Sequence, residues 1–309
     1  MCSPLILLYH GIPRQARHRS IDARAFEEHL RFLKRHCRFT SAANYSQANG
    51  SLRRPVVMLT FDDGLRSHAE VVAPLLQKYG IPATFFISTL HSAPGKYLWF
   101  TYLRMLKTWF QGDRLRMDGK TVTFSAHRQQ TMAALEERLL ALRPHPQAMY
   151  ECIATLPRLE EFVPRDVMAD ECEGMPPELV RQLASEPLFT IGGHTTDHPY
   201  LTLCTPEEID CQLHDNKAWI ERLTGRQCKL FAYPGGILNR FVLDRCRREY
   251  ERAFALEWSD VLDEHYAIHR IGICAGSRLR LGFKLWAGRW LPFKQIEPVQ
   301  KLIHAIADT

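Results

Sequence analysis

The stretch Val56–Gly64 reads Val-Val-Met-Leu-Thr-Phe-Asp-Asp-Gly and decides which fold class the sequence favours. Its first six residues form a hydrophobic, β-rich run, and Gly64 releases the chain into a turn after two adjacent carboxylates. Because α/β barrels place their chemistry at the carboxyl ends of parallel strands, Asp62 and Asp63 are candidates for a functional site. An ordinary turn would explain Asp-Asp-Gly equally well by itself. Two unbalanced charges at one strand end repel each other, however, and a bound cation would relieve that repulsion.

Short apolar runs of the same kind recur along the chain between longer helical patterns. This alternation predicts a parallel sheet or barrel of the α/β class. Seven candidate strands, rather than eight, indicate an incomplete barrel. We expect strands at Pro4–Tyr9, Val56–Phe61, Ala83–Ile87, Leu188–Ile191, Lys229–Ala232, Arg252–Leu256 and Ala267–Ile273.

Three segments carry the spacing of amphipathic helices, with apolar residues on one face. They are Ala23–His36, Ser67–Tyr79 and Pro206–Leu223. The last has Thr205 as a candidate N-cap and Glu208 three residues later, which is the pattern of a capping box. It also has proline at its first helical position.

The alternation breaks between Ile87 and Leu188, where about 100 residues stand in place of the roughly 15–25 that one connecting helix needs. We expect a mostly helical insertion over residues 91–178, a possible lid, within a single domain of residues 1–309. Its expected helices are Tyr97–Phe110, Gln130–Leu142 and Gln147–Leu156. Its aromatic side chains favour a small core over a sugar-binding platform; they are Tyr97, Trp99, Phe100, Tyr102, Trp109 and Phe110.

The composition is that of a globular protein, with 46% hydrophobic and 24% charged residues among 309. The net charge of +6 is modest and its basic residues are scattered. This favours a solvated surface over attraction to anionic lipids or glycans, and it gives no support to nucleic-acid binding. We find no internal repeat.

The nine cysteines include no CxxC pair, which argues against a disulfide framework or a zinc knuckle and favours a reducing compartment. The N-terminal segment has neither the basic region nor the cleavage site of a signal peptide, and no apolar run is long enough to span a membrane. We therefore expect a cytoplasmic protein. Aromatic and basic residues alternate in Leu281–Ile306, which is interpreted as a closing helix on the barrel in preference to an amphipathic helix that contacts a membrane surface.

A second chemical signal lies in Thr190–His198, where an apolar strand again leads into a loop and two histidines stand four residues apart. This spacing can direct both imidazoles at one metal ion. A histidine pair alone is usually incidental. Together with a carboxylate from another strand end, it gives the ligand set of a catalytic zinc site or a non-haem iron site.

Two further strand ends carry candidate residues. His10 follows the first expected strand. This position makes a catalytic role about as well supported as the interpretation of an ordinary surface or core histidine. Phe231–Gly236 reads Phe-Ala-Tyr-Pro-Gly-Gly, and such a turn can expose backbone N–H groups as an oxyanion hole requires. A plain tight turn is the alternative.

Thr60–Gly64 and His194–His198 resemble the first two motifs of the polysaccharide deacetylases, the NodB-homology enzymes of carbohydrate esterase family four. Outside the insertion, the resemblance covers roughly Leu5–Ile273. It implies a distorted (β/α)7 barrel, in agreement with the strand count, and a hydrolase that removes an acetyl group from an N-acetylated sugar.

The resemblance also implies roles for individual residues. Asp63, His194 and His198 would bind a divalent metal ion, usually Zn²⁺, which activates a water molecule, and Asp62 would be the general base. In the third motif, the N–H of Gly235 would help to bind the oxyanion, with Tyr233 and Pro234 as candidate substrate-binding residues.

The sequence departs from the commonest family pattern at two points. The third motif begins with Phe231 where the family usually has arginine, and Arg270 is a candidate to replace it as the partner of Asp62. The usual C-terminal Leu-x-His motif is not evident. In the exopolysaccharide-deacetylase branch a catalytic histidine lies on the first strand in a Tyr-His motif, so His10 is assigned as the general acid and His269 as the second candidate.

Two other functions stay open. The chain could be a family member that binds glycans without turnover, or a metal-dependent amidohydrolase or O-acetyl esterase with a substrate other than a polysaccharide. The expected location favours a glycan precursor, such as a lipid-linked or nucleotide-linked amino sugar, as the substrate.

Overall fold

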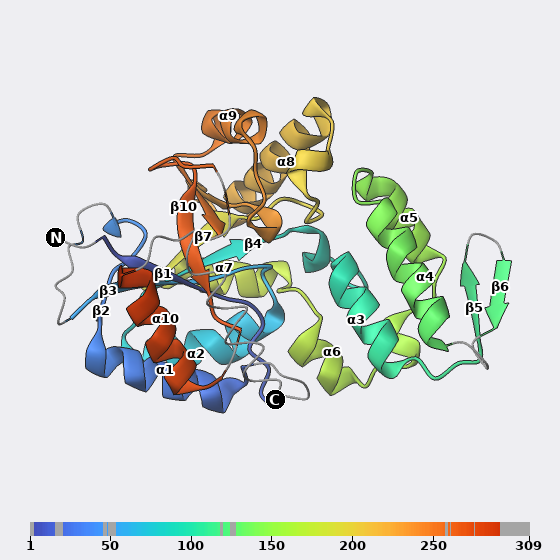
Figure 1. Cartoon of the computed structure of the whole chain (residues 1–309), viewed down its shortest axis with the longest axis horizontal. Helices are drawn as coiled ribbons and strands as arrows, with labels where there is room; N and C mark the ends of the chain where they lie inside the picture. The colour runs from blue at the N-terminus through green and yellow to red at the C-terminus, as the bar shows by residue number, and fades with distance from the viewer. Residues whose placement is uncertain are drawn as a thin grey trace.

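A closed barrel of seven parallel strands forms the centre of the molecule (Figure 1). The computed structural model describes residues 3–15, 21–45, 48, 54–117, 120–123, 128–256, 259, 261–274 and 276–290. Around the barrel the strand order is β1 (Leu5–Tyr9), β10 (Ile268–Gly272), β9 (Arg252–Leu256), β8 (Leu230–Ala232), β7 (Phe189–Gly193), β4 (Ala83–Ile87) and β3 (Val56–Phe61). The five-residue pairing of β1 with β3 closes the ring. The predicted distorted (β/α)7 barrel is confirmed. A short strand, β2 (Arg38–Phe39), also pairs with the start of β3.

The expected strand bounds differ most at β7, which was expected to end at Ile191 and continues to Gly193. Glycine is disfavoured in strands, so the sequence pattern ended early. Here the two glycines are required by close packing. A Cβ atom at Gly192 would lie 2.5 Å from the Phe86 ring, and one at Gly193 would lie 2.5 Å from the Tyr250 hydroxyl.

Helices cover the outside of the barrel. They are α1 (Ala23–His36), the π-helical turn η2 (His68–Val72), α2 (Ala73–Tyr79), α7 (Pro177–Ser185), α8 (Pro206–Thr224), α9 (Arg240–Glu249) and α10 (Arg278–Trp290). The expected helix Ser67–Tyr79 is therefore divided into a π-helical and an α-helical part. Helix α10 buries Leu281 and Leu285 in the main core, as a closing helix does; residues 291–306 of the predicted C-terminal segment lie outside the described residues.

Side-chain alternation along the strands divides the core into two layers. On β3, Val57, Leu59 and Phe61 belong to the main core, which also contains the buried faces of the helices. Met58 belongs to a small cluster inside the barrel, with Ile6, Phe86, Leu230, Ala232, Phe254 and Ile268. Because successive side chains point to opposite faces, Thr60 and Asp62 follow Met58 toward the interior.

A second hydrophobic cluster lies in the mostly helical region between β4 and β7, which extends to the side of the barrel in Figure 1. Its elements are α3 (Trp99–Trp109), β5 (Arg114–Met117), β6 (Lys120–Thr123), α4 (Arg128–Ala141), α5 (Pro146–Ala154) and α6 (Arg165–Glu171). The antiparallel pair β5–β6 was not expected, although Asp118-Gly119 is a hairpin signal in the sequence.

The aromatic residues of this region do form a core. Tyr97, Trp99, Tyr102 and Phe110 are buried in the second cluster, and Phe100 and Trp109 pack against it. The bounds 91–178 of the insertion, and its action as a lid, stay predictions.

In the described part of the chain, no helix combines the length and apolar character that crossing a membrane requires. The cysteines among the described residues are all free thiols.

The capping box at the start of α8 offers a test of the fold. The Thr205 hydroxyl accepts a hydrogen bond from the Glu208 N–H, and the Glu208 carboxylate accepts one from the Thr205 N–H. Thr205→Ala should lower the free energy of unfolding by about 0.5–2 kcal/mol, because a helical N–H loses its acceptor. Denaturant unfolding measures this loss. Thr205→Ser keeps the acceptor and is the control; equal stability of the two variants would contradict the cap.

Candidate active site

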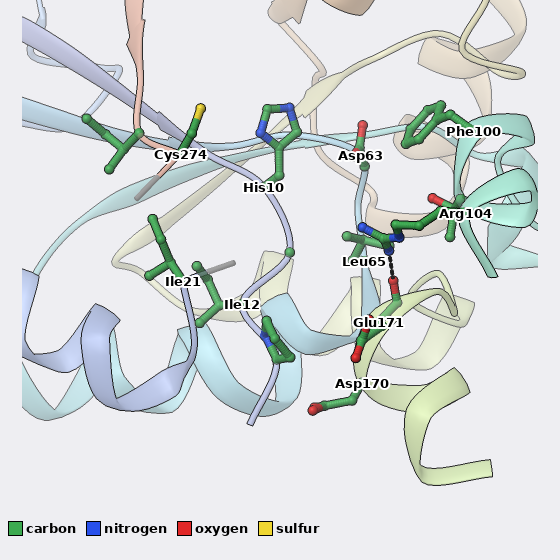
Figure 2. Close-up of a pocket in the computed structure, with 14 residues that line it drawn as sticks. His10, Ile12, Ile21, Asp63, Leu65, Phe100, Arg104, Asp170, Glu171 and Cys274 are labelled. Carbon is green, nitrogen blue, oxygen red and sulfur yellow. Dashed lines mark hydrogen bonds between the residues drawn. The ribbon is translucent and has the colours of Figure 1, made fainter. Parts of the chain in front are cut away.

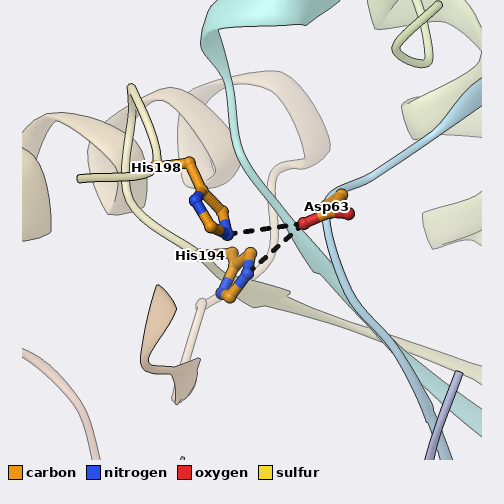
Figure 3. Close-up of side chains that lie close together, drawn as sticks. All are labelled: Asp63, His194 and His198. Atoms are coloured by element: carbon orange, nitrogen blue, oxygen red, sulfur yellow. Dashed lines mark ion pairs between the residues drawn. The ribbon is translucent and has the colours of Figure 1, made fainter. Parts of the chain in front are cut away.

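Three side chains from two strand ends meet at the carboxyl end of the barrel. Asp63 follows β3, and His194 and His198 follow β7. The Nε2 atoms of both histidines lie 3.6 Å from Oδ1 of Asp63, and Figure 3 shows both rings turned toward this oxygen. One potential ligand atom of each residue lies within 4.8 Å of the others, and all three residues are buried.

The geometry of this cluster fits a single small cation. Ligand atoms that bind one tetrahedral ion at about 2.1 Å lie roughly 3.4 Å apart, close to the observed separations. One carboxylate and two imidazoles leave a coordination position open, as in a catalytic zinc site.

The charges around the cluster also favour a bound cation. Burial alone would raise the pKa of Asp63, but the hydrogen bond with His194 and the nearby imidazoles outweigh it and hold the pKa well below its usual range. Burial, followed by repulsion from His194, lowers the pKa of His198 to about 4, which leaves its ring neutral at pH 7. Burial lowers the pKa of His194 as well, yet the attraction of Asp62 and Asp63 raises it overall. The site therefore draws positive charge toward the carboxylates.

His194 has a fixed orientation. Its Nδ1 lies 2.7 Å from the carbonyl oxygen of Ala232, at the end of β8. When Nδ1 is protonated, it donates a hydrogen bond to this carbonyl, and the lone pair of Nε2 is free to bind a metal.

The loops that carry Asp63 and the two histidines contain strained backbone. Asp63, Thr195 and His198 have φ values of 77°, 64° and 55°, in the left-handed region that residues other than glycine rarely adopt. Hydrogen bonds hold these conformations: the Asp63 carbonyl accepts from the Ser88 N–H at 3.1 Å and from His91 Nε2 at 2.7 Å. The Thr195 hydroxyl oxygen accepts from the His198 N–H at 3.0 Å.

Two amides of α8 support the histidine loop, and sequence reasoning missed both. Asn216 accepts from the His194 N–H at 3.2 Å and donates to the carbonyls of Thr195 at 2.6 Å and Ile87 at 2.9 Å. Gln212 accepts from the N–H groups of Thr196 and Asp197 at 3.0 Å. Their signal was available, because these two polar residues stand four apart on the buried face of an amphipathic helix.

Asp62 points into the barrel, where Arg270 forms a bidentate ion pair with it. The Nη1–Oδ1 and Nη2–Oδ2 distances are 2.6 and 2.7 Å, and Arg270 is fully buried. Burial would raise the pKa of Asp62, but the charge of Arg270, then that of His194, lowers it overall. The expected partner of Asp62 is therefore in place, although its catalytic role stays a prediction.

The two candidates for the general acid lie in different environments. His269 precedes Arg270 on β10, so alternation directs it away from the interior, toward the helical layer. His10 is exposed at the end of β1 and lines a cleft of about 330 Å³ together with Asp63. Figure 2 shows His10 on one side of Asp63, and Phe100 and Arg104 on the other. The ring of Phe100 also contacts His198, with 4.9 Å between centroids.

The third motif follows β8 beside His194. Gly235 has a φ of 62°, and a Cβ atom there would lie 2.8 Å from the Tyr200 ring. Pro234 is buried in the same turn. Tyr233 is fully buried in the main core, and its hydroxyl donates to the Tyr266 carbonyl at 2.9 Å. The structure therefore brings the turn to the site but places the Tyr233 side chain, a predicted substrate contact, away from it.

Comparison with known families agrees with this arrangement. The polysaccharide deacetylase family model matches residues 49–137 and 153–249. The chain belongs to the polysaccharide deacetylase family. Among curated protein sequences, none matches it at a significant level.

Solved structures of polysaccharide deacetylases and related deacetylases share the fold. BC0361, a polysaccharide deacetylase from Bacillus cereus, has a TM-score of 0.57 and 14% identity over 92% of this chain and 69% of its own. IcaB from Ammonifex degensii has a TM-score of 0.56 and 17% identity, covering 93% of this chain and 97% of its own. The Streptococcus pyogenes deacetylase PplD, solved with acetate, has a TM-score of 0.53 and 18% identity over 91% and 97%. At these identities the likeness establishes the fold alone.

The buried ion pair can be tested by its effect on stability. Arg270→Met should lower the free energy of unfolding by about 3–5 kcal/mol, because it leaves the Asp62 carboxylate buried without its partner. Chemical denaturation at pH 7 measures the loss. Adding Asp62→Asn to this variant should restore part of the stability, since no unpaired charge then remains; wild-type stability of Arg270→Met alone would rule out a structural ion pair.

Proposed function

We propose that this polysaccharide deacetylase family member removes the acetyl group from an N-acetylated sugar of a glycan or glycan precursor, with a divalent metal ion as cofactor. The observation that carries the proposal is the buried Asp63, His194 and His198 cluster. It lies beside a second carboxylate, Asp62, that Arg270 holds apart from it.

Asp63, His194 and His198 would hold the metal, and the donor set suits Zn²⁺. A divalent ion bound there would act as a Lewis acid toward the acetyl carbonyl and lower the pKa of a bound water. Neutral His198 and ionised Asp63 are the protonation states that such ligation requires.

Asp62 would serve as the general base. Its Oδ2 lies 3.9 Å from Nε2 of His194, so the carboxylate borders the metal cluster without belonging to it. Arg270 keeps Asp62 ionised and fixes its orientation, which allows it to accept a proton from the attacking water. The same pairing lowers its basicity, so the reaction depends on position more than on proton affinity.

Two other groups would stabilise the oxyanion and protonate the leaving group. The N–H of Gly235 would stabilise the oxyanion that forms as water adds to the acetyl carbon. His10, across the cleft, would donate a proton to the sugar nitrogen as the C–N bond breaks, so that acetate and a free amine are released.

Removal of a ligand tests the metal proposal. Asp63→Ala and His194→Ala should each lose bound zinc and acetate release together, measured by elemental analysis and by an acetate assay on N-acetyl sugars. Asp197→Asn is a matched control, because Asp197 lies in the same loop but its carboxylate accepts from Gln212. Full zinc content and activity in Asp63→Ala would contradict the assigned ligand set.

Removal of the base separates binding from turnover. Asp62→Asn should keep its zinc and lose acetate release by roughly 10²–10⁴-fold. The substituted amide can still accept one hydrogen bond from Arg270, and unfolding measurements check that the variant is folded. Turnover close to wild type in the folded variant would show that Asp62 is not the base. Metal binding without acetate release by the wild type itself would instead favour the glycan-binding alternative.

The assignment of His10 predicts a dependence on the leaving group. An amine needs protonation to depart, whereas the alkoxide from an O-acetyl ester needs it less. His10→Ala should therefore slow N-deacetylation far more than O-deacetylation, measured by acetate release from matched N- and O-acetyl substrates. His269→Ala should leave this ratio unchanged; the reverse pattern would transfer the role to His269.

A further inference from the structure

The cleft that contains His10 and Asp63 has a neighbour, a second hollow of about 530 Å³. The two share the side chains of Phe100, Arg104 and Glu171. Trp99 and Arg143 line the second hollow but not the first. A substrate that places its acetyl group at Asp63 can therefore extend along the helical region.

The residues that line the two hollows carry charges of both signs, and some of these charges are paired. Lys107 pairs with Glu136, and Asp170 pairs with Arg14. Arg104 and Arg143 form no ion pair with any described carboxylate. Arg104 donates instead to the backbone carbonyl of Glu171 at 2.8 Å, as Figure 2 shows.

The guanidinium of Arg143 lies over two aromatic rings. It lies 4.6 Å from the ring centroid of Tyr200 and 5.3 Å from that of Trp99. Its Nε atom is buried and has no hydrogen-bond acceptor among the described residues. Tyr200 in turn lies against Gly235, so one aromatic ring separates Arg143 from the proposed oxyanion site. Such fixed geometry reduces the entropy that binding a ligand would cost.

We propose that Arg104 and Arg143 bind an anionic group, a phosphate or a carboxylate, which the substrate carries next to its acetylated sugar. This inference rests on the proposed function and specifies its substrate class. Planar guanidinium groups bind the oxygens of both anions in a bidentate manner. Glu171 opposes an anion through its charge, but its backbone carbonyl orients Arg104 along the groove. The phosphate would belong to a nucleotide-linked or lipid-linked sugar, and the carboxylate to an acidic glycan.

The test compares three substrates that share an N-acetylglucosamine unit. UDP-N-acetylglucosamine carries phosphate, a disaccharide of N-acetylglucosamine and glucuronic acid carries carboxylate, and N,N′-diacetylchitobiose is neutral. Acetate release gives kcat/KM, and calorimetry gives Kd independently of turnover, for the metal-loaded wild type and for Arg104→Gln and Arg143→Gln. Arg35→Gln is the matched control, since Arg35 is exposed on α1, outside both hollows.

The wild type should prefer one of the anionic substrates. Each groove variant should weaken that preference by roughly 10- to 100-fold, as expected for the loss of a charged hydrogen bond, and leave the neutral substrate within about threefold. The anionic substrate whose kcat/KM falls more in the variants shows whether the arginines bind a phosphate or a carboxylate. Arg143→Lys should recover part of the loss, because it keeps the charge without the planar fork.

Equal losses for neutral and anionic substrates would assign the arginines a purely structural role and overturn the inference. Equal Kd values for all three substrates in the wild type would overturn it as well. Neither result affects the proposed deacetylation, which fails separately if the metal-loaded protein releases no acetate from any N-acetyl sugar. Arg104 is exposed, so Arg104→Gln remains informative even if Arg143→Gln destabilises the fold.

Discussion

The buried ion pair between Asp62 and Arg270 determines how the rest of the site is organised. A carboxylate taken from water into a barrel interior is stable only with a well-placed counter-charge. Arg270 provides one through two hydrogen bonds from β10 to the end of β3. Because this pairing occupies Asp62, the adjacent Asp63 is the carboxylate left to face the two histidines. The division between the two neighbouring acids thus follows from strand alternation and charge compensation.

A second constraint is the backbone that turns Asp63 and His198 toward each other. Both residues adopt left-handed conformations, which cost of order 1–3 kcal/mol each unless the surroundings compensate. Hydrogen bonds from Ser88 and His91 to the Asp63 carbonyl, and from the His198 N–H to Thr195, hold these conformations. Fully buried Asn216 supports the same histidine loop and joins it to the end of β4. Helix α8 therefore supports the candidate site as well as the core, and the stability of the helix is linked to that of the histidine loop.

The sequence predicted those parts of the molecule that depend on regular periodicity. Val56–Phe61, Ala83–Ile87 and Arg252–Leu256 were predicted with the observed bounds, because hydrophobic strands of a barrel leave a clear signature. Arg270 was named as a candidate partner of Asp62 because Phe231 stands where the family usually has arginine, and the structure places Arg270 and Asp62 in contact. Gly192 and Gly193 were assigned to a loop because their place in β7 depends on the Phe86 ring and the Tyr250 hydroxyl, which no local pattern reveals. The contact of Phe100 with His198 depends likewise on how α3 packs against the barrel.

The helical region between β4 and β7 supplies side chains that could determine which substrate is bound. The proposed roles of the Asp63, His194 and His198 cluster and of the Asp62–Arg270 pair concern the acetyl group alone, and they contain nothing that distinguishes one acetylated sugar from another. Phe100 and Arg104 lie on successive turns of α3 and border the same cleft as Asp63. Arg143 connects the Trp99 ring of that helix to Tyr200, a residue of the barrel loops. Side-chain contacts therefore link the proposed recognition groups to the proposed chemical groups. Because these contacts come from a segment that is separate in sequence from the barrel strands, substrate choice can change there without disturbing the buried charges of the proposed site.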